Sequence, residues 1–308
     1  MHLAQFAQAE SWFGLFDEEE MEKLLLAGKI ARAVRQAVPR MVFQGASVLG
    51  ICEWVESEIA RMGGSPAFPC NVSINEVGAH YTSPTSDTTV VPDGALVKVD
   101  LGVHIDGFIA DTAVTVSVGS EFEDMIKAAE LALERGVQAV RVGGKIGDVG
   151  PLVEKTIRSM GYKPIRNLTG HQIEQYTIHS GLSIPNVSGS EPTGKFQPWS
   201  VYAIEPFATL PRAIGEVKEG APGNILHLVK LKRPKTEPQK GAYEEIYRRF
   251  RTLPFAKRWV AGIGEAVSKL LAEKVLYEYP VLVEASGMPI AQTEHTVVTT
   301  DKESIVTT

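Results

Sequence analysis

Apolar residues recur at helical spacing near the start of the chain. Residues 17–38 carry acidic side chains in their first turn, where the helix dipole favours them. The apolar positions that follow have the helical period, and they are Met21, Leu24, Leu25, Ile30 and Val34. Similar patterns predict helices over about residues 45–62, closed by two glycines, and over about 121–141.

A glycine-rich segment follows the third predicted helix. Its glycines, at positions 143, 144, 147 and 150, fit neither dinucleotide-binding nor Walker spacing, and the segment follows a helix and not a strand. We therefore interpret it as the end of one helix and the start of another, with Asp148 as the expected N-cap.

Residues 95–119 predict a β-hairpin, because two alternating segments flank the dipeptide Asp106-Gly107, a strong turn signal. In a hairpin with a two-residue loop, opposed residues have an odd sum of residue numbers. Asp100 and Asp111 meet this condition, so both carboxylates should face the same side of the sheet. The pattern leaves two registers open: the carboxylates lie directly opposite, roughly 5 Å apart, or diagonally, roughly 7–8 Å apart.

A change of composition suggests an insertion in the second half of the chain. From Pro211 to about Gln239, Pro, Gly, Lys and Glu dominate, and two helical patterns follow. The strand patterns on either side, residues 200–210 and 279–300, are expected to be neighbours in one sheet. Without a clean linker or a repeat, we predict a single domain over residues 1–308, with a helical insertion at approximately 211–275.

Composition narrows the class of protein. The 308 residues are 44% hydrophobic and 22% charged, which is typical of a globular protein. The net charge of -6 argues against a dedicated nucleic-acid binder, and the one basic cluster is more typical of a solvated helix face. Its members are Arg248, Arg249, Arg251, Lys257 and Arg258.

The lack of a recognisable targeting signal and the isolated cysteines both favour the cytoplasm. Cys52 and Cys70 form neither a disulfide framework nor a C-x-x-C pair, which fits a reducing compartment. No apolar run is long enough to span a bilayer, and the first residues lack the order of a signal peptide. We expect a cytoplasmic protein without membrane contact.

Two acids within Val- and Ile-rich strands are costly unless a cation compensates them. Taken alone, Asp100 and Asp111 fit a solvated sheet face as well as a metal site. His171, Glu205 and Glu294 change this balance, because carboxylates and imidazole together suit divalent Mn, Fe, Co or Zn and differ from the thiolates of structural zinc sites.

The order of these motifs resembles the methionine aminopeptidase family. The carrying segments are VDLGVHIDGFIAD, GHQIEQYTIHSGLSIPN, YAIEPFAT and the terminal TEHT. The insertion, with its segment TLPFAKRW, is similar to that of the type II branch in its short archaeal form. The resemblance covers the chain from about residue 17 onward. It implies the pita-bread fold, of α/β (α+β) class, with an antiparallel sheet in pseudo-two-fold halves and helices outside.

The resemblance also implies two divalent metal ions and a ligand set. Asp100 would bind the first ion and Asp111 would bridge both. His171 and Glu205 would complete the second site, with Glu294 as another bridge. Glu205 would also be the catalytic base.

Further positions match residues that contact substrate in the family. His80 would contact the scissile amide nitrogen and His179 the carbonyl oxygen. Phe68, Ile178 and Tyr279 would line the methionine pocket. The family pattern near HYTPxxGD is altered here, where Ser83-Pro84-Thr85-Ser86 precedes Asp87. The spacing from His80 to Asp87 is kept, so we expect a different local turn and unchanged chemistry.

The implied activity is removal of the initiator methionine from new proteins with a small second residue. The expected partner is the N-terminal peptide of a nascent protein, with transient proximity to the ribosome, and the expected state is a monomer. Two alternatives stay open: an X-Pro aminopeptidase or prolidase of the same fold, and a non-catalytic pita-bread binding protein.

Overall fold

The chain is described from a computed structural model, which covers residues 16–119, 121–189, 194–231 and 233–308. The helices are α1 (Glu18–Ala37), α2 (Val48–Arg61), α3 (Glu123–Ala139), α4 (Val149–Ser159), α5 (Gln239–Phe250) and α6 (Gly264–Ala272), with 3-10 turns η1 (Val38–Arg40), η2 (Ile146–Asp148) and η3 (Lys257–Ile263). The strands are β1 (Ser65–Ile74), β2 (Val77–Ala79), β3 (Ala95–Ile105), β4 (Phe108–Val118), β5 (Lys163–Pro164), β6 (Gly170–Ile173), β7 (Ser183–Ile184), β8 (Ser200–Ile204), β9 (Phe207–Thr209), β10 (Val217–Leu228), β11 (Phe255–Ala256), β12 (Leu276–Glu284), β13 (Ile290–Gln292), β14 (Glu294–Thr299) and β15 (Ser304–Val306). Residues 1–15, which lack signal-peptide order, lie outside the described residues.

The predicted helices are confirmed, and their starts have a clear cause. At α1 the Asp17 side chain accepts a hydrogen bond from the Glu20 backbone amide at 2.8 Å, while the Glu20 carboxylate accepts one from the Asp17 amide. At α2 the Ser47 hydroxyl accepts from the Gly50 amide. Asp148 precedes α4 as predicted, but its side chain makes no capping bond.

The main sheet has the strand order β1-β3-β4-β14-β8-β6-β7, with β15 beside β14. A second sheet runs β11-β10-β12-β2, and a third runs β13-β9-β5. All the pairings are antiparallel, as the fold class requires. The strand patterns on the two sides of the predicted insertion are indeed neighbours, since β8 pairs with β14 and β9 pairs with β13.

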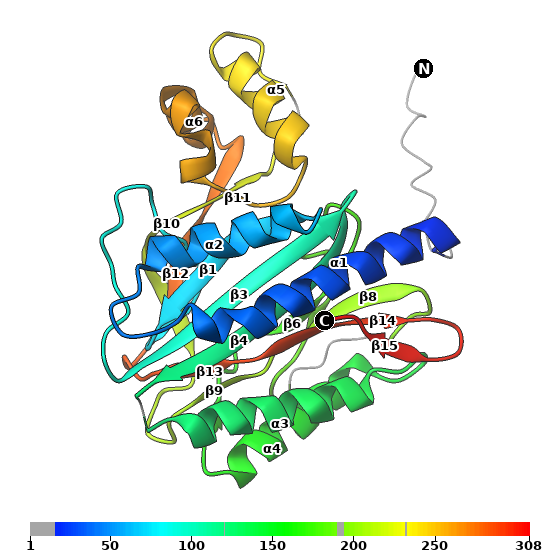
Figure 1. Cartoon of the computed structure of the whole chain (residues 1–308). Coiled ribbons are helices and arrows are strands. Elements are labelled where there is room, and N and C mark those ends of the chain that lie inside the picture. The colour runs from blue at the N-terminus through cyan, green and yellow to red at the C-terminus, as the bar shows by residue number, and fades with distance from the viewer. Residues whose placement is uncertain (1–15, 120, 190–193, 232) are drawn as a thin grey trace.

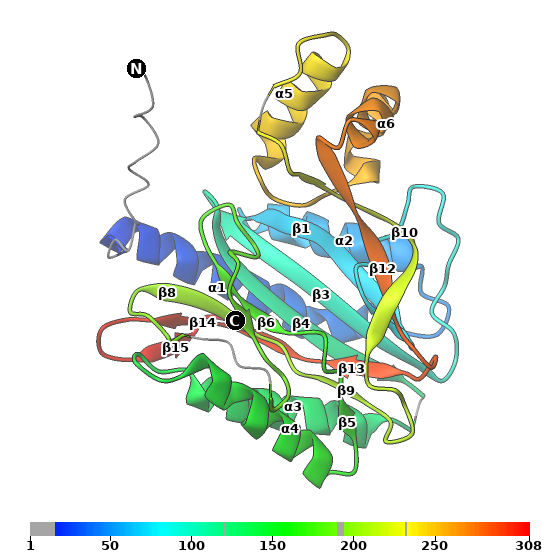
Figure 2. The same ribbon diagram turned by 180° about the vertical axis from the view of Figure 1, so that it is seen from behind.

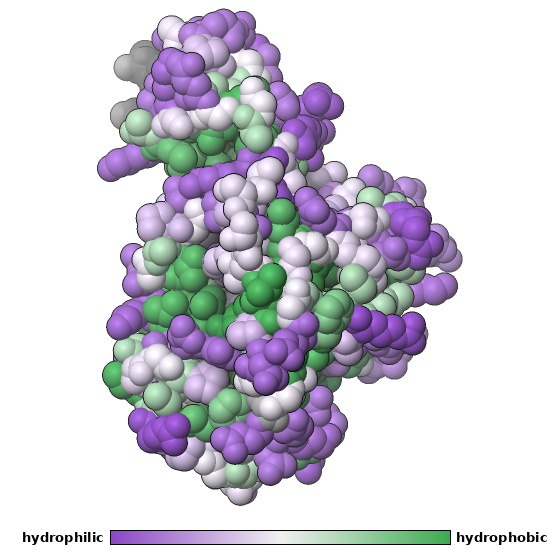
Figure 3. All heavy atoms as spheres, turned by 60° about the vertical axis from the view of Figure 1, so that its left-hand side comes forward, coloured by the Kyte–Doolittle hydropathy of each residue, from purple (hydrophilic) through white to green (hydrophobic). Residues whose placement is uncertain are grey.

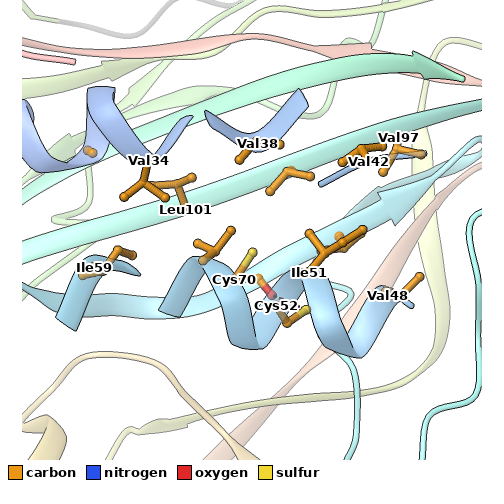
Figure 4. Close-up of a cluster of buried hydrophobic side chains, with 14 of the residues drawn as sticks. Val34, Val38, Val42, Val48, Ile51, Cys52, Ile59, Cys70, Val97 and Leu101 are labelled. Atoms are coloured by element: carbon orange, nitrogen blue, oxygen red, sulfur yellow. Dashed lines mark hydrogen bonds between the residues drawn. The ribbon is translucent and has the colours of Figure 1, made fainter. Parts of the chain in front are cut away.

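Two pairs of helices cover one side of the curved main sheet. In Figure 1, α1 and α2 lie over β1, β3 and β4, whereas α3 and α4 lie over the strands of the other half. Each pair encloses its own apolar core. Figure 4 shows the first core, in which Val34 of α1 lies beside Leu101 of β3, while Val38 of η1 and Ile51 of α2 belong to the same cluster. The helices are therefore on the outside, and the opposite side of the sheet, seen in Figure 2, is left for the site.

The helices α5 and α6 stand at one end of the molecule with a separate core. Their lobe carries hydrophilic residues over most of the face in Figure 3 and rises above the body of the protein. Both predicted helices of the insertion are thus present, but β10 belongs to the sheet with β12, so the helical part is narrower than 211–275. The division into one domain with an insertion stays a prediction.

A buried ion pair ties this lobe to the first half. The Arg258 guanidinium pairs with the Glu56 carboxylate of α2, and their side chains are only 6% and 12% exposed. Arg258 also donates to the Thr82 hydroxyl at 2.8 Å, and the Trp259 indole donates to Glu56 at 3.0 Å. The interpretation of the basic cluster as a solvated helix face is therefore wrong for Arg258, because its positive charge neutralises a buried acid.

Two further expectations concern cysteines and membranes. Cys52 and Cys70 are free thiols, both buried in the core of the first half. Among the described residues, no helix has the length and apolar character needed to cross a membrane.

Candidate metal centre

The hairpin of β3 and β4 carries the first two acids. Ile105 pairs with Phe108, so the loop contains only Asp106 and Gly107, with φ angles of 49° and 87° that fit a type I′ turn. Asp111 pairs with Gly102. Asp100 and Asp111 therefore share a face, as predicted, and of the two registers left open the diagonal one is present.

A side chain added at Gly107, in the turn, is expected to lower the free energy of unfolding. A Cβ atom at Gly107 would lie 2.3 Å from Tyr176 Cδ2, and Gly107 has a left-handed backbone. Gly63 has a similar φ of 88° with open space around it. We expect Gly63→Ala to lose about 1–2 kcal/mol of unfolding free energy and Gly107→Ala a further ~1–3 kcal/mol from the clash. Urea unfolding measures both, and equal losses would show that Tyr176 moves away freely.

Three neighbouring strands supply the other candidates. His171 lies on β6, Glu205 directly follows β8, and Glu294 begins β14. The order β4-β14-β8-β6 sets these strands side by side (Figure 2). Gly170 allows the close pairing of β6 with β8, because a Cβ there would lie 2.3 Å from the Ala203 carbonyl oxygen. Residues far apart in sequence thus meet on one face.

The side chains converge tightly. His171 Nε2 lies 3.6 Å from Asp111 Oδ2 and 3.6 Å from Glu205 Oε1. Ligand atoms of Asp111, His171 and Glu294 all lie within 4.8 Å of one another. These three residues are 3%, 6% and 1% exposed, so water cannot compensate their charges.

Burial and mutual repulsion disfavour the charged forms. Burial raises the pKa of Asp100 to about 7. Burial, and then the charges of neighbouring carboxylates, raise the pKa values of Asp111, Glu205 and Glu294 well above their usual range. Burial also lowers the pKa of His171 to about 3, which keeps its imidazole neutral and able to bind a metal.

Unpaired oxygen atoms show what the cluster lacks. Asp100 Oδ1, Asp111 Oδ1 and Glu294 Oε1 are buried without a hydrogen-bond partner. Such orphaned acceptors are rare in native proteins and call for an explanation. A divalent cation would bind these oxygens and offset the repulsion, and the oxygen and imidazole donors fit Mn, Fe, Co or Zn. The residues present therefore fit a metal site.

A cavity of about 360 Å³ lies over this cluster. Its wall includes every site residue predicted from the sequence, and these are Phe68, His80, Asp100, Asp111, His171, Ile178, His179, Glu205, Tyr279 and Glu294. The structure brings all of them together at one place, whereas their individual roles stay predictions.

The two further imidazoles occupy different walls. The His179 ring lies 4.4 Å from that of His171, centre to centre, at 70°. His80 stands edge-on to Tyr279, with ring centres 5.2 Å apart, and its Nδ1 approaches the Pro280 carbonyl oxygen at 3.3 Å. Its φ of 65° is unusual for a residue other than glycine and marks a constrained position.

The altered turn after His80 is held by hydrogen bonds. Asp87 Oδ2 accepts from the Ser83 hydroxyl at 2.7 Å and from the Tyr81 hydroxyl at 2.9 Å. The Asp87 carboxylate thus organises the segment that follows His80.

Among the polar residues of the cavity wall that were not foreseen, two lie next to Asp100. Gln292 donates to Asp100 Oδ2 at 3.4 Å, and Asn71 lies on β1 opposite Asp100. Gln292 stands two residues before Glu294, a spacing that could have drawn attention to it. No pattern in the sequence pointed to Asn71.

Comparison with known proteins agrees with this geometry. Residues 22–301 match the model of metallopeptidase family M24. The chain is 42% identical to a methionine aminopeptidase of Thermococcus onnurineus over 94% of its own length and 100% of that protein's. It is 43% identical to the methionine aminopeptidase of Saccharolobus solfataricus, over 94% of this chain and 98% of the relative.

Solved structures share the fold at lower identity. A thermophilic Arx1 superposes with a TM-score of 0.79 at 18% identity, covering 96% of this chain and 91% of that one. A methionine aminopeptidase of Thermotoga maritima gives 0.66 at 20% identity, covering 96% and 98%. Prolidase from Pyrococcus furiosus gives 0.61 at 16% identity, covering 95% and 64%. These likenesses show the pita-bread fold alone, whereas the sequence relatives show the family. The chain therefore belongs to metallopeptidase family M24 and, within it, to the methionine aminopeptidases.

Proposed function

We propose that this chain removes the N-terminal methionine from proteins whose second residue is small, and that the buried cluster is its catalytic centre. The observation that carries the proposal is the set of unpartnered carboxylate oxygens of Asp100, Asp111 and Glu294 at the cavity. Family membership gives the substrate class, because the relatives are methionine aminopeptidases.

Two divalent ions would be held by the five predicted ligands. Asp100 would hold the first ion, His171 and Glu205 would hold the second, and Asp111 and Glu294 would serve both. Bound there, such ions would polarise the scissile carbonyl and lower the pKa of a water toward about 7. The identity of the metal depends on its availability as much as on the ligands.

The remaining chemistry belongs to the side chains of this protein. Glu205 accepts the proton of the attacking water and passes it to the leaving amine, a role open to a carboxylate in the wall of the substrate cavity. His80 contacts the scissile amide nitrogen. His179 steadies the carbonyl oxygen as negative charge develops on it.

The apolar part of the cavity recognises the methionine side chain. Phe68 and Ile178 are 8% and 6% exposed and belong to one apolar cluster. Tyr279 contributes a ring from the opposite sheet, and burial raises its pKa to about 12, so it stays neutral. Aromatic rings make favourable contacts with a thioether sulfur. These residues would hold the side chain while the backbone lies over the acids.

The cellular setting follows from this substrate. The partner is the N-terminal peptide of a nascent protein, which brings the enzyme near the ribosome for short periods. We expect it to act in the cytoplasm as a monomer.

A peptide panel tests the proposal. Met-X-Ser peptides with X from Gly to Leu would be assayed with Mn, Fe, Co and Zn, beside an X-Pro peptide and a chelated sample. We expect release of methionine only with metal and only for small X. Cleavage of the X-Pro peptide in preference to Met-Gly-Ser would favour a prolidase, and a protein that binds no metal would favour a non-catalytic relative.

Loss of one ligand should affect one metal site. Residues that only orient a metal ligand typically contribute about 10–100-fold to metal affinity. Loss of the ligand itself should cost at least as much, so His171→Ala should weaken one of the two sites by at least about tenfold. Titration calorimetry measures both sites. His104→Ala, outside the cavity wall, serves as the control. Unchanged stoichiometry and affinity in His171→Ala would contradict its role as a ligand.

A further inference from the structure

Asn71 is a polar residue with an unused acceptor in the wall of the cavity. It lies on β1 with 5% of its surface exposed, and its Oδ1 atom is buried without a hydrogen-bond partner. Among the described residues, the buried carboxylate oxygens without a partner all belong to predicted metal ligands, whereas Asn71 Oδ1 is an amide oxygen. Asn71 is therefore an orphaned group that the proposed metal site leaves unexplained.

The orientation of the Asn71 amide is fixed by its other end. Its Nδ2 donates to the Pro69 carbonyl oxygen at 3.0 Å. A flipped amide would bring two acceptor oxygens together, so Oδ1 is the atom left without a partner. Asn71 Oδ1 therefore lacks a hydrogen-bond donor.

A β-bulge turns Asn71 to the side where substrate is expected. Phe68 pairs with Gly102 and Asn71 pairs with Asp100, so β1 has one residue more than β3 between these points. In a regular strand, residues three apart point to opposite faces, but the extra residue brings both into the cavity wall. A Cβ at Gly102 would lie 2.3 Å from Phe68 Cε1, so the glycine makes room for this arrangement.

We infer that Asn71 Oδ1 accepts a hydrogen bond from the α-amino group of the substrate's first residue. This inference rests on the proposed function. An N-terminal methionyl peptide offers two donors near the scissile bond, the α-amine and the scissile N–H, and His80 is assigned to the latter. The α-amine and the side chain leave the same carbon atom. Phe68, in the side-chain pocket, and Asp100, in the metal site, flank the position of Asn71.

The consequence is selectivity for a free amino terminus. A peptide whose α-amine is blocked or absent would leave Oδ1 buried and unsatisfied, and a site with buried unpaired polar groups rejects such an analogue. Asn71 would thus help the enzyme to distinguish the end of a chain from an internal methionine.

Paired ligands with and without the amine test this role. Calorimetry on the metal-loaded enzyme would compare L-methioninamide with 4-(methylthio)butanamide, which lacks only the α-amine. Asn71→Leu keeps the branched shape of the side chain and removes the acceptor. Asn71→Ser keeps a donor for the Pro69 carbonyl but is too short to reach the ligand. Ser73→Ala, buried on the same strand outside the cavity wall, is the control.

Both Asn71 variants should bind methioninamide about 10–100-fold more weakly, the range of a hydrogen bond to a charged group. Binding of the des-amino analogue and the metal stoichiometry should stay unchanged. An equal loss for both ligands would overturn the inference in favour of a shape role, and a loss of metal would overturn it in favour of a ligand role.

The same calorimetry gives a different result if the proposed function itself is wrong. In that case the unaltered enzyme would take up metal without binding methioninamide, or would bind no metal. An amine preference that persists in both variants would overturn the role of Asn71 alone.

Discussion

Replacing Glu205 by glutamine is expected to lower the rate of methionine release by a factor of about 10²–10⁴, the usual contribution of a positioned general base. Glutamine has the same shape and retains one ligand oxygen, so the fold and part of the metal binding should remain. It cannot take a proton from water. The measurement is kcat for a Met-Gly-Ser peptide, together with metal content.

Glu174→Gln is the matched control, because Glu174 is exposed and follows β6 on the same segment as His171. It should leave kcat unchanged. Near-normal release of methionine by Glu205→Gln would exclude Glu205 as the base, and loss of all metal would mean that its contribution is chiefly that of a ligand.

Removing Arg258 should have the largest effect on stability. Arg258→Met leaves the Glu56 carboxylate buried without its counter-charge, and breaking a buried pair in this way costs about 3–5 kcal/mol. The surface pair of Arg61 with Glu58 provides the control, and Arg61→Met should have little effect on stability, because solvent screens the pair. Urea unfolding at pH 7 measures both.

The double variant Glu56→Gln with Arg258→Met should recover part of the loss, because it removes the uncompensated charge. The loss should also depend on pH. Burial already raises the pKa of Glu56, with Arg258 as the main opposing charge, so losing Arg258 raises that pKa further. A carboxyl group with a raised pKa in the folded state destabilises that state as pH rises, so the deficit should shrink from pH 7 to pH 5. A constant deficit would show that the packing of Arg258 matters and its charge does not.

Local patterns predicted a large part of this structure because they depend on near neighbours. The dipeptide Asp106-Gly107 set the loop length of the hairpin, and parity then placed Asp100 and Asp111 on one face. Parity could not choose between the opposite and diagonal registers, since both satisfy it. The register depends on which residue directly precedes the turn, and the structure shows Ile105 paired with Phe108.

Features that depend on distant or irregular contacts were missed. The pairing of Glu56 with Arg258 joins residues far apart in sequence, and in the sequence Arg258 appears beside other basic residues. The position of Asn71 depends on a bulge, and a strand pattern without the bulge would have turned it away from Phe68. The five predicted ligands were brought together by family resemblance, because three of them lie on or directly after strands with no local pairing signal.

The place of β14 in the main sheet has a consequence for biosynthesis. This strand lies between β4 and β8, and it carries Glu294. While the ribosome is still making the chain, the first half can form with β4 as an open edge, and β8 forms another. Neither edge finds its neighbour until residues 294–299 have emerged. Until then, exposed edges invite pairing with other chains. Completion of the sheet and delivery of Glu294 to the cluster are therefore one event, so a copy whose synthesis has not reached β14 lacks a complete centre.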